Sequence, residues 1–146
     1  MSVTDGDYEK LLSLRTALRR FERWSEQQAR AAGLTPAQHQ LLLAIKGHRD
    51  ERGPTIGEVA DYLLLRHHSA VGLIDRADTA GVVTRYRDPD DHRVVRLRLT
   101  RKGAGRLERL SALHLEELRR LGPKLAGVAI GLDPMQSAHG LARNAG

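Results

Sequence analysis

The chain has 146 residues, of which 40% are hydrophobic and 29% charged, with a net charge of +6 and no cysteine. These values predict one globular domain with its own core, and the lack of cysteine excludes a disulfide framework, a thiolate metal site and a thiol redox switch. No apolar run approaches the roughly 18 residues of a membrane-spanning helix, and the first residues lack the pattern of a secretory signal. We therefore expect a cytoplasmic protein without a membrane partner. The aromatic content of 3% argues against single-strand binding by base stacking.

The first predicted element is a long helix over residues 7–32, which Gly33 ends. Its apolar residues recur every three or four positions and therefore form one stripe: Leu11, Leu14, Leu18, Phe21 and Trp24. A stripe of this length on so small a protein needs a partner to cover it.

Two capping boxes mark the next two helices. Thr35 and Gln38, with Pro36 at the first helical position, start a second helix. Thr55 and Glu58 start a short third one.

A fourth helix is predicted from about His67 to Ala80, and Gly81 ends it. Its inward-facing residues are expected to be Val71, Ile74 and Ala77. The third and fourth helices are joined by a tight turn, which is the arrangement of a helix-turn-helix.

Two strands follow, over residues 82–87 and 94–99, and the Asp-Pro-Asp-Asp sequence between them has strong turn chemistry. The second strand places valine and leucine on one face and Arg96 and Arg98 on the other, as a half-buried strand does. The pattern predicts a β-hairpin.

Thr100 is expected to cap a second long helix, which runs from Arg101 to about Leu121 and is broken by Gly122 and Pro123. We expect roughly the last 20 residues to be weakly ordered, because glycines weaken their helical pattern.

The positive charge is concentrated at the predicted hairpin. Residues 84–106 carry eight Lys or Arg against three Asp, which gives +5 of the +6 on the whole chain. Such a concentration is typical of a nucleic-acid binder. A solvated basic surface is the alternative, and the adjoining helix-turn-helix favours the nucleic-acid interpretation.

These residues resemble the MarR family of bacterial winged-helix transcription regulators. Asp91-His92-Arg93 is similar to the family's Asp-x-Arg loop, and Leu99-Thr100 with Gly103 to its Leu-Thr-x-x-Gly junction between strand and helix. Further similar segments are Leu34-Thr35-x-x-Gln38 and Leu73-Ile74-Asp75-Arg76, the latter ending at Gly81. In their order and spacing the motifs cover about residues 7–121.

The resemblance implies a mostly α fold with a small β-hairpin (α+β), in which a winged helix-turn-helix is flanked by N- and C-terminal dimerisation helices. The domains would be an N-terminal dimerisation helix over residues 1–34, a DNA-binding domain over 35–100 and C-terminal dimerisation helices over 101–146. The protein would be a homodimer, which would cover the stripe on the first helix.

The resemblance also assigns a DNA interface to two elements. The fourth predicted helix, over residues 67–80, would be the recognition helix, which enters the major groove and contacts bases or phosphates. Its expected contact residues are Arg66, His67, His68, Ser69 and, with an open role, Arg76. The predicted hairpin would be the wing. There Arg93 would enter the minor groove, and Asp91 would orient it by a charge-assisted hydrogen bond. The other expected wing contacts are His92 at the tip and the phosphate-binding strand residues Arg85, Arg87, Arg96 and Arg98.

Metal binding and catalysis are not indicated. His67 and His68 are adjacent and point to different sides of a helix, and His114 with Glu117 is a spacing common on solvated helix faces. Since no nucleophile, base or Gly-rich phosphate loop has the required spacing, we expect no enzyme, no metal and no cofactor.

The leading hypothesis is a dimeric transcription regulator that binds double-stranded DNA sequence-specifically. It would act as a repressor, and a small ligand, phenolic or otherwise aromatic, would release it from DNA. The ligand-binding residues are unknown. One alternative is a winged helix that binds DNA constitutively. The other is a winged-helix module for protein–protein interaction.

Overall fold

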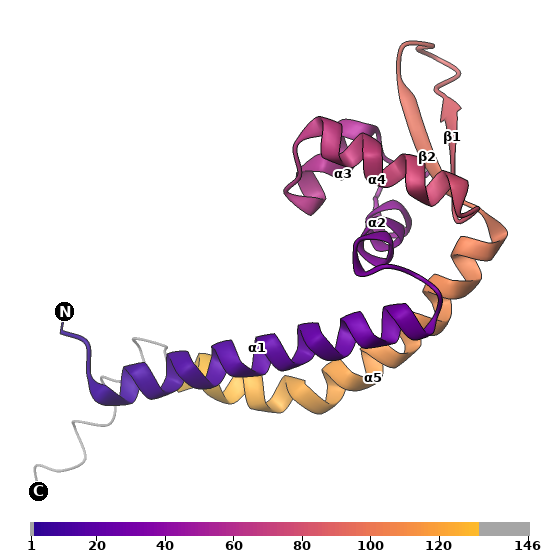
Figure 1. Ribbon diagram of the computed structural model, residues 1–146. Helices are drawn as coiled ribbons and strands as arrows, with labels where there is room; N and C mark the ends of the chain where they lie inside the picture. The colour runs from indigo at the N-terminus through magenta and orange to yellow at the C-terminus, as the bar shows by residue number, and fades with distance from the viewer. Residues whose placement is uncertain (1, 132–146) are drawn as a thin grey trace, which may run out of the picture. The chain divides into compact units, whose positions relative to one another are not determined.

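The computed structural model of the protein describes residues 2–131. Five helices and two strands follow one another in the order α1, α2, α3, α4, β1, β2, α5 (Figure 1). Their bounds are Asp5–Ala31 for α1, Pro36–Gly47 for α2, Ile56–Leu63 for α3, His67–Thr79 for α4, Val83–Arg87 for β1, Val95–Leu99 for β2 and Arg101–Gly131 for α5. The predicted fold class is confirmed.

The chain divides into two compact units. The first consists of the chain up to Trp24 together with the chain from Leu113 onward, and the second is the continuous segment Ser25–Ala112. The second unit therefore contains the helix-turn-helix and the hairpin, and the first contains most of α1 and the later part of α5.

Threonine side chains start four of the five helices. Both predicted capping boxes are present: Thr35 Oγ1 accepts from the Gln38 N–H at 3.1 Å, and Thr55 Oγ1 accepts from the Glu58 N–H at 3.2 Å. Thr4 caps α1 in the same way, and Thr100 caps α5 by accepting from the Gly103 N–H at 3.1 Å. These bonds satisfy N–H groups that have no partner within the first helical turn.

The turn of the helix-turn-helix is closed by a leucine in an uncommon conformation. Leu64 has a φ of 54° and a ψ of 41°, the left-handed region that usually holds glycine. Its N–H and that of Leu65 bond back to carbonyls in the last turn of α3. The Leu64 side chain is 92% exposed.

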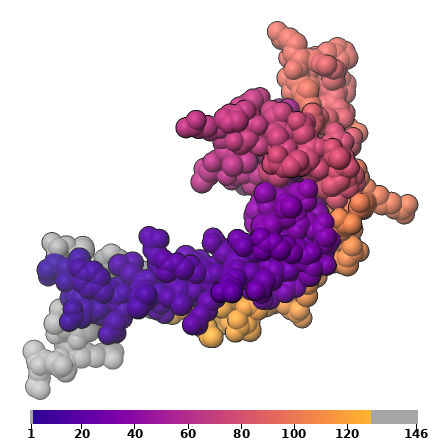
Figure 2. Space-filling model, viewed as in Figure 1, coloured from indigo at the N-terminus to yellow at the C-terminus, as the bar shows by residue number. Residues whose placement is uncertain are grey.

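The hairpin pairs β1 with β2 in antiparallel register, with Arg85 opposite Leu97 and Tyr86 opposite Arg96. The loop between α2 and α3 runs beside β2 and bonds to it: the Leu97 N–H donates to the Pro54 carbonyl at 3.0 Å. In Figure 2 the hairpin tip stands clear of the other elements of the second unit.

The core of the second unit lies between its helices and the inner face of the hairpin. Its fully buried large side chains are Leu41, Leu42, Val59, Ile74, Val82, Val83, Leu97 and Leu110. On α4 the expectation needs one correction: Val71 is only half-buried, whereas Ala70 and Leu73 join Ile74 and Ala77 inside. The prediction therefore holds for Ile74 and Ala77 but not for Val71.

The C-terminal helix continues past the predicted break. Pro123 lies inside α5, which ends at Gly131. A proline in a helix loses one backbone hydrogen bond but does not prevent the following turns. In the first unit, Leu125 and Val128 line a groove together with α1 residues, and this packing favours the helical continuation. The predicted break at Gly122 and Pro123 was therefore wrong, and residues 132–146, which make up most of the segment expected to be weakly ordered, lie outside the described part.

Within residues 2–131, no helix is long and apolar enough to cross a lipid bilayer.

Gly103 allows α5 to pass close to Val82, the residue that precedes β1, and this close approach can be tested. A Cβ at Gly103 would lie 2.0 Å from the Val82 carbonyl oxygen, so a side chain there forces the helix and hairpin apart. We expect Gly103→Ala to lower the free energy of unfolding by about 1–3 kcal/mol in urea titrations. Gly105→Ala is the control, because its Cβ meets only Arg109 Nη1 at an ordinary 3.8 Å. The control should be neutral or up to about 1 kcal/mol more stable, and equal effects of the two substitutions would contradict the close approach.

Candidate nucleic-acid interface

The first turn of α4 has no side-chain cap. Its N-cap residue, Arg66, makes no side-chain hydrogen bond to the helix, unlike the threonines that cap the other four helices. His67 and His68 are exposed and Ser69 is half-buried. The N–H groups of this turn and the positive end of the helix dipole are therefore free to bind an anion.

Arg76 lies further along α4 and is exposed. A Cβ at Gly72 would lie 3.3 Å from Arg76 Nη1, so the guanidinium folds back along the helix over the glycine. The lack of a side chain at Gly72 makes room for this arrangement. The positive charge of Arg76 therefore lies beside Gly72, one turn back toward the start of α4.

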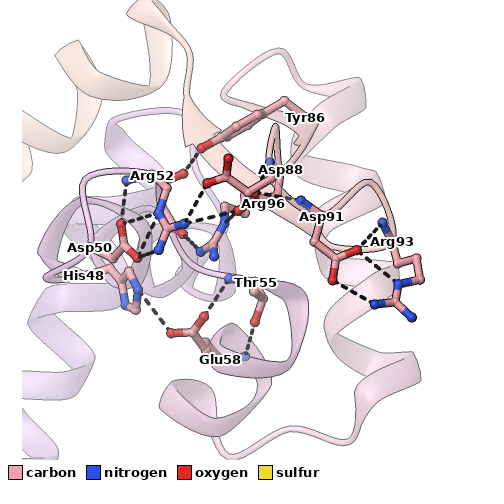
Figure 3. Close-up of polar contacts among 12 residues, drawn as sticks. His48, Asp50, Arg52, Thr55, Glu58, Tyr86, Asp88, Asp91, Arg93 and Arg96 are labelled. Carbon is pink, nitrogen blue, oxygen red and sulfur yellow. Dashed lines mark hydrogen bonds and ion pairs between the residues drawn. The ribbon is translucent and has the colours of Figure 1, made fainter.

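The tip of the hairpin carries an ion pair between Asp91 and Arg93. The Asp91 carboxylate accepts from the Arg93 backbone N–H at 3.1 Å, from Nε at 3.1 Å and from Nη2 at 3.3 Å (Figure 3). These bonds, from the guanidinium first and the backbone N–H second, lower the pKa of Asp91 below its ordinary value. The Arg93 side chain is 91% exposed, so the predicted contact is present and holds a cation that faces the solvent.

Asp88 begins the tip and is buried, with only 3% of its side chain exposed. Its Oδ1 accepts from the N–H groups of Asp90 at 2.8 Å and Asp91 at 3.2 Å, and its Oδ2 accepts from Arg96 Nε. The bond from Arg96 and then those from the backbone lower the pKa of Asp88. A carboxylate this well paired stays ionised although it is out of water.

Two of the four predicted strand arginines form ion pairs and hydrogen bonds with other elements of the second unit. The side chain of Arg96 is 12% exposed, and its Nη1 donates to the Gly53 carbonyl at 2.9 Å. Arg85 donates to Asp75 on α4, and its Nε lies 3.7 Å from Asp78 Oδ2. The expected location of these two side chains on a free basic surface is therefore corrected: Arg96 binds the α2–α3 loop and Arg85 binds α4.

The other two strand arginines face outward. Arg87 is exposed and donates from Nη1 to the His92 carbonyl at 2.8 Å. Arg98 is exposed, and its guanidinium carbon lies 3.6 Å from the centroid of the Tyr86 ring, a cation–π contact that orients it. His92 is exposed beside Arg93 at the tip. These outward cations, with Arg93 and the start of α4, form the candidate interface.

Comparison with known proteins identifies the fold. Residues 32–94 match the model of the MarR family. The fold is similar to that of a MepR mutant of S. aureus bound to an oligodeoxyribonucleotide, at 18% identity over 97% of this chain and 93% of that chain, with a TM-score of 0.64. It is also similar to AbsC of Streptomyces coelicolor (19% identity, 95% and 89% covered, TM-score 0.70) and to apo MarR of E. coli (20% identity, 95% and 93% covered, TM-score 0.63).

The chain has the winged helix-turn-helix fold of these proteins, and its residues 32–94 are similar to the MarR family. No protein of curated function is significantly similar to it in sequence. In this fold the wing is the hairpin of residues 83–99 with its tip at 88–94, and α4 is the second helix of the helix-turn-helix.

The residues that join the wing to the loop between α2 and α3 were not predicted. From the sequence, Asp88 was expected only to contribute turn chemistry, and Arg52 and Tyr86 were assigned no role. The structure places Arg52 Nη1 3.6 Å from Asp88 Oδ2, and the Tyr86 hydroxyl donates to the Arg52 carbonyl. The spacing of Asp88 before two loop residues indicates an Asx-type turn, but nothing local indicates a partner so far away in sequence.

Among residues 2–131, no three His, Asp or Glu side chains lie close enough together to hold a metal ion.

Proposed function

We propose that this protein is a transcription regulator that binds double-stranded DNA sequence-specifically as a homodimer. The observation that carries the proposal is the Asp91–Arg93 pair, which holds an exposed arginine at the tip of the wing. The uncapped, basic start of α4 in the same unit supports it. The similar MepR mutant bound to an oligodeoxyribonucleotide gives the proposal a precedent among proteins of this fold.

In the proposed complex the first turn of α4 enters the major groove. Arg66 and His67 or His68 would contact bases and phosphates, and Ser69 would add a hydroxyl donor. A phosphate oxygen bound at the helix N-terminus would accept from the N–H groups that no side chain caps. Arg76, further along the same helix, would extend the contact into the groove.

The wing would bind the adjacent minor groove through Arg93. Because Asp91 already holds the guanidinium, binding would immobilise few additional rotatable bonds of this side chain. Arg87, Arg98 and His92 would contact phosphates on either side. Arg85 and Arg96 would support the wing from inside and not touch DNA.

Arg93→Ala tests the wing contact. We expect the affinity for the cognate duplex to fall by roughly 1–3 kcal/mol per half-site, since the variant can neither pair with a phosphate nor read the shape of the groove. Fluorescence anisotropy over a range of salt concentrations measures the affinity for the duplex. Arg93→Lys is the matched variant: it keeps the charge, so the slope of log K against log salt should be nearly unchanged while the affinity falls in part. If Arg93→Ala binds as tightly as the unmodified protein, the wing does not contact DNA.

A dimer would bring two recognition helices to half-sites about 10 base pairs apart. The first unit supports dimerisation, because α1 and α5 leave large apolar side chains in water there. These exposed residues are Leu11, Leu12, Leu18, Leu113, Leu115 and Leu118. Leucines at this density on one unit are typical of a surface that another protein surface covers.

Light scattering should therefore give twice the monomer mass of 16.2 kDa at micromolar concentration. We expect the double substitution Leu18→Glu with Leu118→Glu to shift the mass toward the monomer, because a dimer interface would bury the introduced carboxylates of both copies. Leu43→Glu is the control, as Leu43 is similarly exposed on α2 in the second unit. A monomeric unmodified protein would refute the proposed assembly.

We propose further that the protein acts as a repressor that a small aromatic acid releases. A groove of about 520 Å³ in the first unit, a volume typical of small-molecule sites, supports this. Phe21 and Trp24 supply aromatic surface, and Arg20, Arg120 and Lys124 supply positive charge against the single carboxylate of Glu117. Such a lining suits a planar ring with one carboxylate.

Titration of the protein–operator complex with salicylate tests this regulation. We expect release of the DNA, and a weaker response of Arg20→Ala than of Arg15→Ala, whose side chain lies outside the groove. Dilute peroxide should have no comparable effect, because the chain has no cysteine to oxidise. Indifference to every aromatic acid tried would favour a constitutive DNA binder instead.

A further inference from the structure

The loop between α2 and α3 is joined to the wing by a network of charged side chains. The four members, which we call the wing anchor, are Asp50, Arg52, Asp88 and Arg96. Figure 3 shows Arg52 and Arg96 converging on Asp88 from two sides. The anchor lies entirely in the second unit, apart from the candidate DNA contacts at the tip.

The first link is the orientation of Arg52. Asp50 accepts from Arg52 Nε at 3.1 and 3.2 Å and from Nη2 at 2.8 Å, in the two-pronged geometry that fixes a guanidinium. The remaining nitrogen, Nη1, lies 3.6 Å from Asp88 Oδ2 and 3.8 Å from Asp90 Oδ2. Each nitrogen of this half-exposed side chain therefore faces a carboxylate of its own protein.

The second link is Asp88, where the loop and the wing tip meet. One of its oxygens faces Arg52 and Arg96, and the other accepts from the N–H groups of Asp90 and Asp91. The carboxylate therefore ties the backbone of the tip to two arginines. Because it is buried, the removal of either arginine would leave its negative charge poorly compensated.

The third link leads from Asp91 to Arg93. The N–H of Asp91 is bonded to Asp88, and the carboxylate of Asp91 holds the backbone and side chain of Arg93. A continuous path of hydrogen bonds and ion pairs thus runs from the α2–α3 loop to the exposed guanidinium at the tip. Neighbouring contacts support the same junction: Arg96 donates to the Gly53 carbonyl, and the Tyr86 hydroxyl to that of Arg52.

We propose that Arg52 is a positioning residue for Arg93, holding the wing tip through Asp88 in the conformation that binds the minor groove. This inference rests on the proposed function. It makes the α2–α3 loop part of the DNA-binding apparatus without contact to DNA. The alternative is that Arg52 contacts a phosphate directly, and the two roles differ in whether the effect of removing Arg52 depends on Arg93.

The first test uses the full chain without DNA, so that it does not depend on the proposed function. We expect Arg52→Ala to lower the ¹⁵N order parameters of residues 88–94 from about 0.85, the value of rigid backbone, toward 0.6 or below. The control is Arg49→Ala, which removes the same charge from the same loop and should leave them unchanged. If Arg52→Ala fails to fold, Arg52→Lys keeps the charge but cannot make the two-pronged contact with Asp50 and serves instead. Unchanged order parameters would overturn the inference.

The second test is a double-mutant cycle on duplex affinity. Arg52→Ala should weaken binding about threefold to tenfold more than Arg49→Ala does. In an Arg93→Ala background this extra effect should vanish, because no guanidinium remains to be positioned. If Arg52 contacts a phosphate, the effects of Arg52→Ala and Arg93→Ala on duplex affinity should be additive, and the salt slope should fall by about one for each phosphate that is no longer bound. This result would overturn the inference. If no variant and no unmodified protein binds any duplex, the proposed function fails, and the order parameters alone decide whether Arg52 holds the tip.

Discussion

The wing depends on a buried negative charge that must be paired. Asp88 has almost no exposed surface, and an ionised carboxylate out of water is tolerated only when hydrogen bonds and opposite charges surround it. The chain supplies Arg96 from β2, Arg52 from the α2–α3 loop and two N–H groups from the tip itself. These four partners come from three segments, so satisfying one carboxylate fixes where the three segments meet.

This pairing divides the arginines of the hairpin region into two groups. Arg85 and Arg96 pair with carboxylates and are largely withdrawn from solvent, whereas Arg87, Arg93 and Arg98 are exposed, Arg93 although it pairs with Asp91. The local excess of positive charge is therefore not a uniform basic surface. Internal pairs shape the wing, and the outward cations at and beside its tip are the ones available to phosphate. A count of charges along the sequence cannot separate the two groups, because both have the same residue type and the same alternation.

Helix capping shows a similar division between structure and function. Threonines cap α1, α2, α3 and α5, and each satisfies N–H groups that would otherwise lack a partner. Helix α4, unlike these four, starts with an uncapped arginine, and the exposed, left-handed Leu64 lies two residues before it. Sites where a local rule is broken are often functional, because unsatisfied groups and strained backbone are kept where a ligand will meet them. The proposed phosphate contact at the start of α4 would satisfy these groups.

The sequence by itself determined the features that depend on chemistry within a few residues. The capping boxes at Thr35 and Thr55 and the stop at Gly81 depend on groups a few positions apart, and the alternation along β2 on a simple periodicity. Only the tertiary structure decided which residues of distant segments meet. The pairing of Arg52 with Asp88, the inward turn of Arg85 and Arg96, and the continuation of α5 through Pro123 follow from packing between segments, whose geometry no local pattern contains. The contact of Asp91 with Arg93 was expected from the resemblance of the Asp-x-Arg loop, whereas no local pattern indicated the anchor that holds the tip.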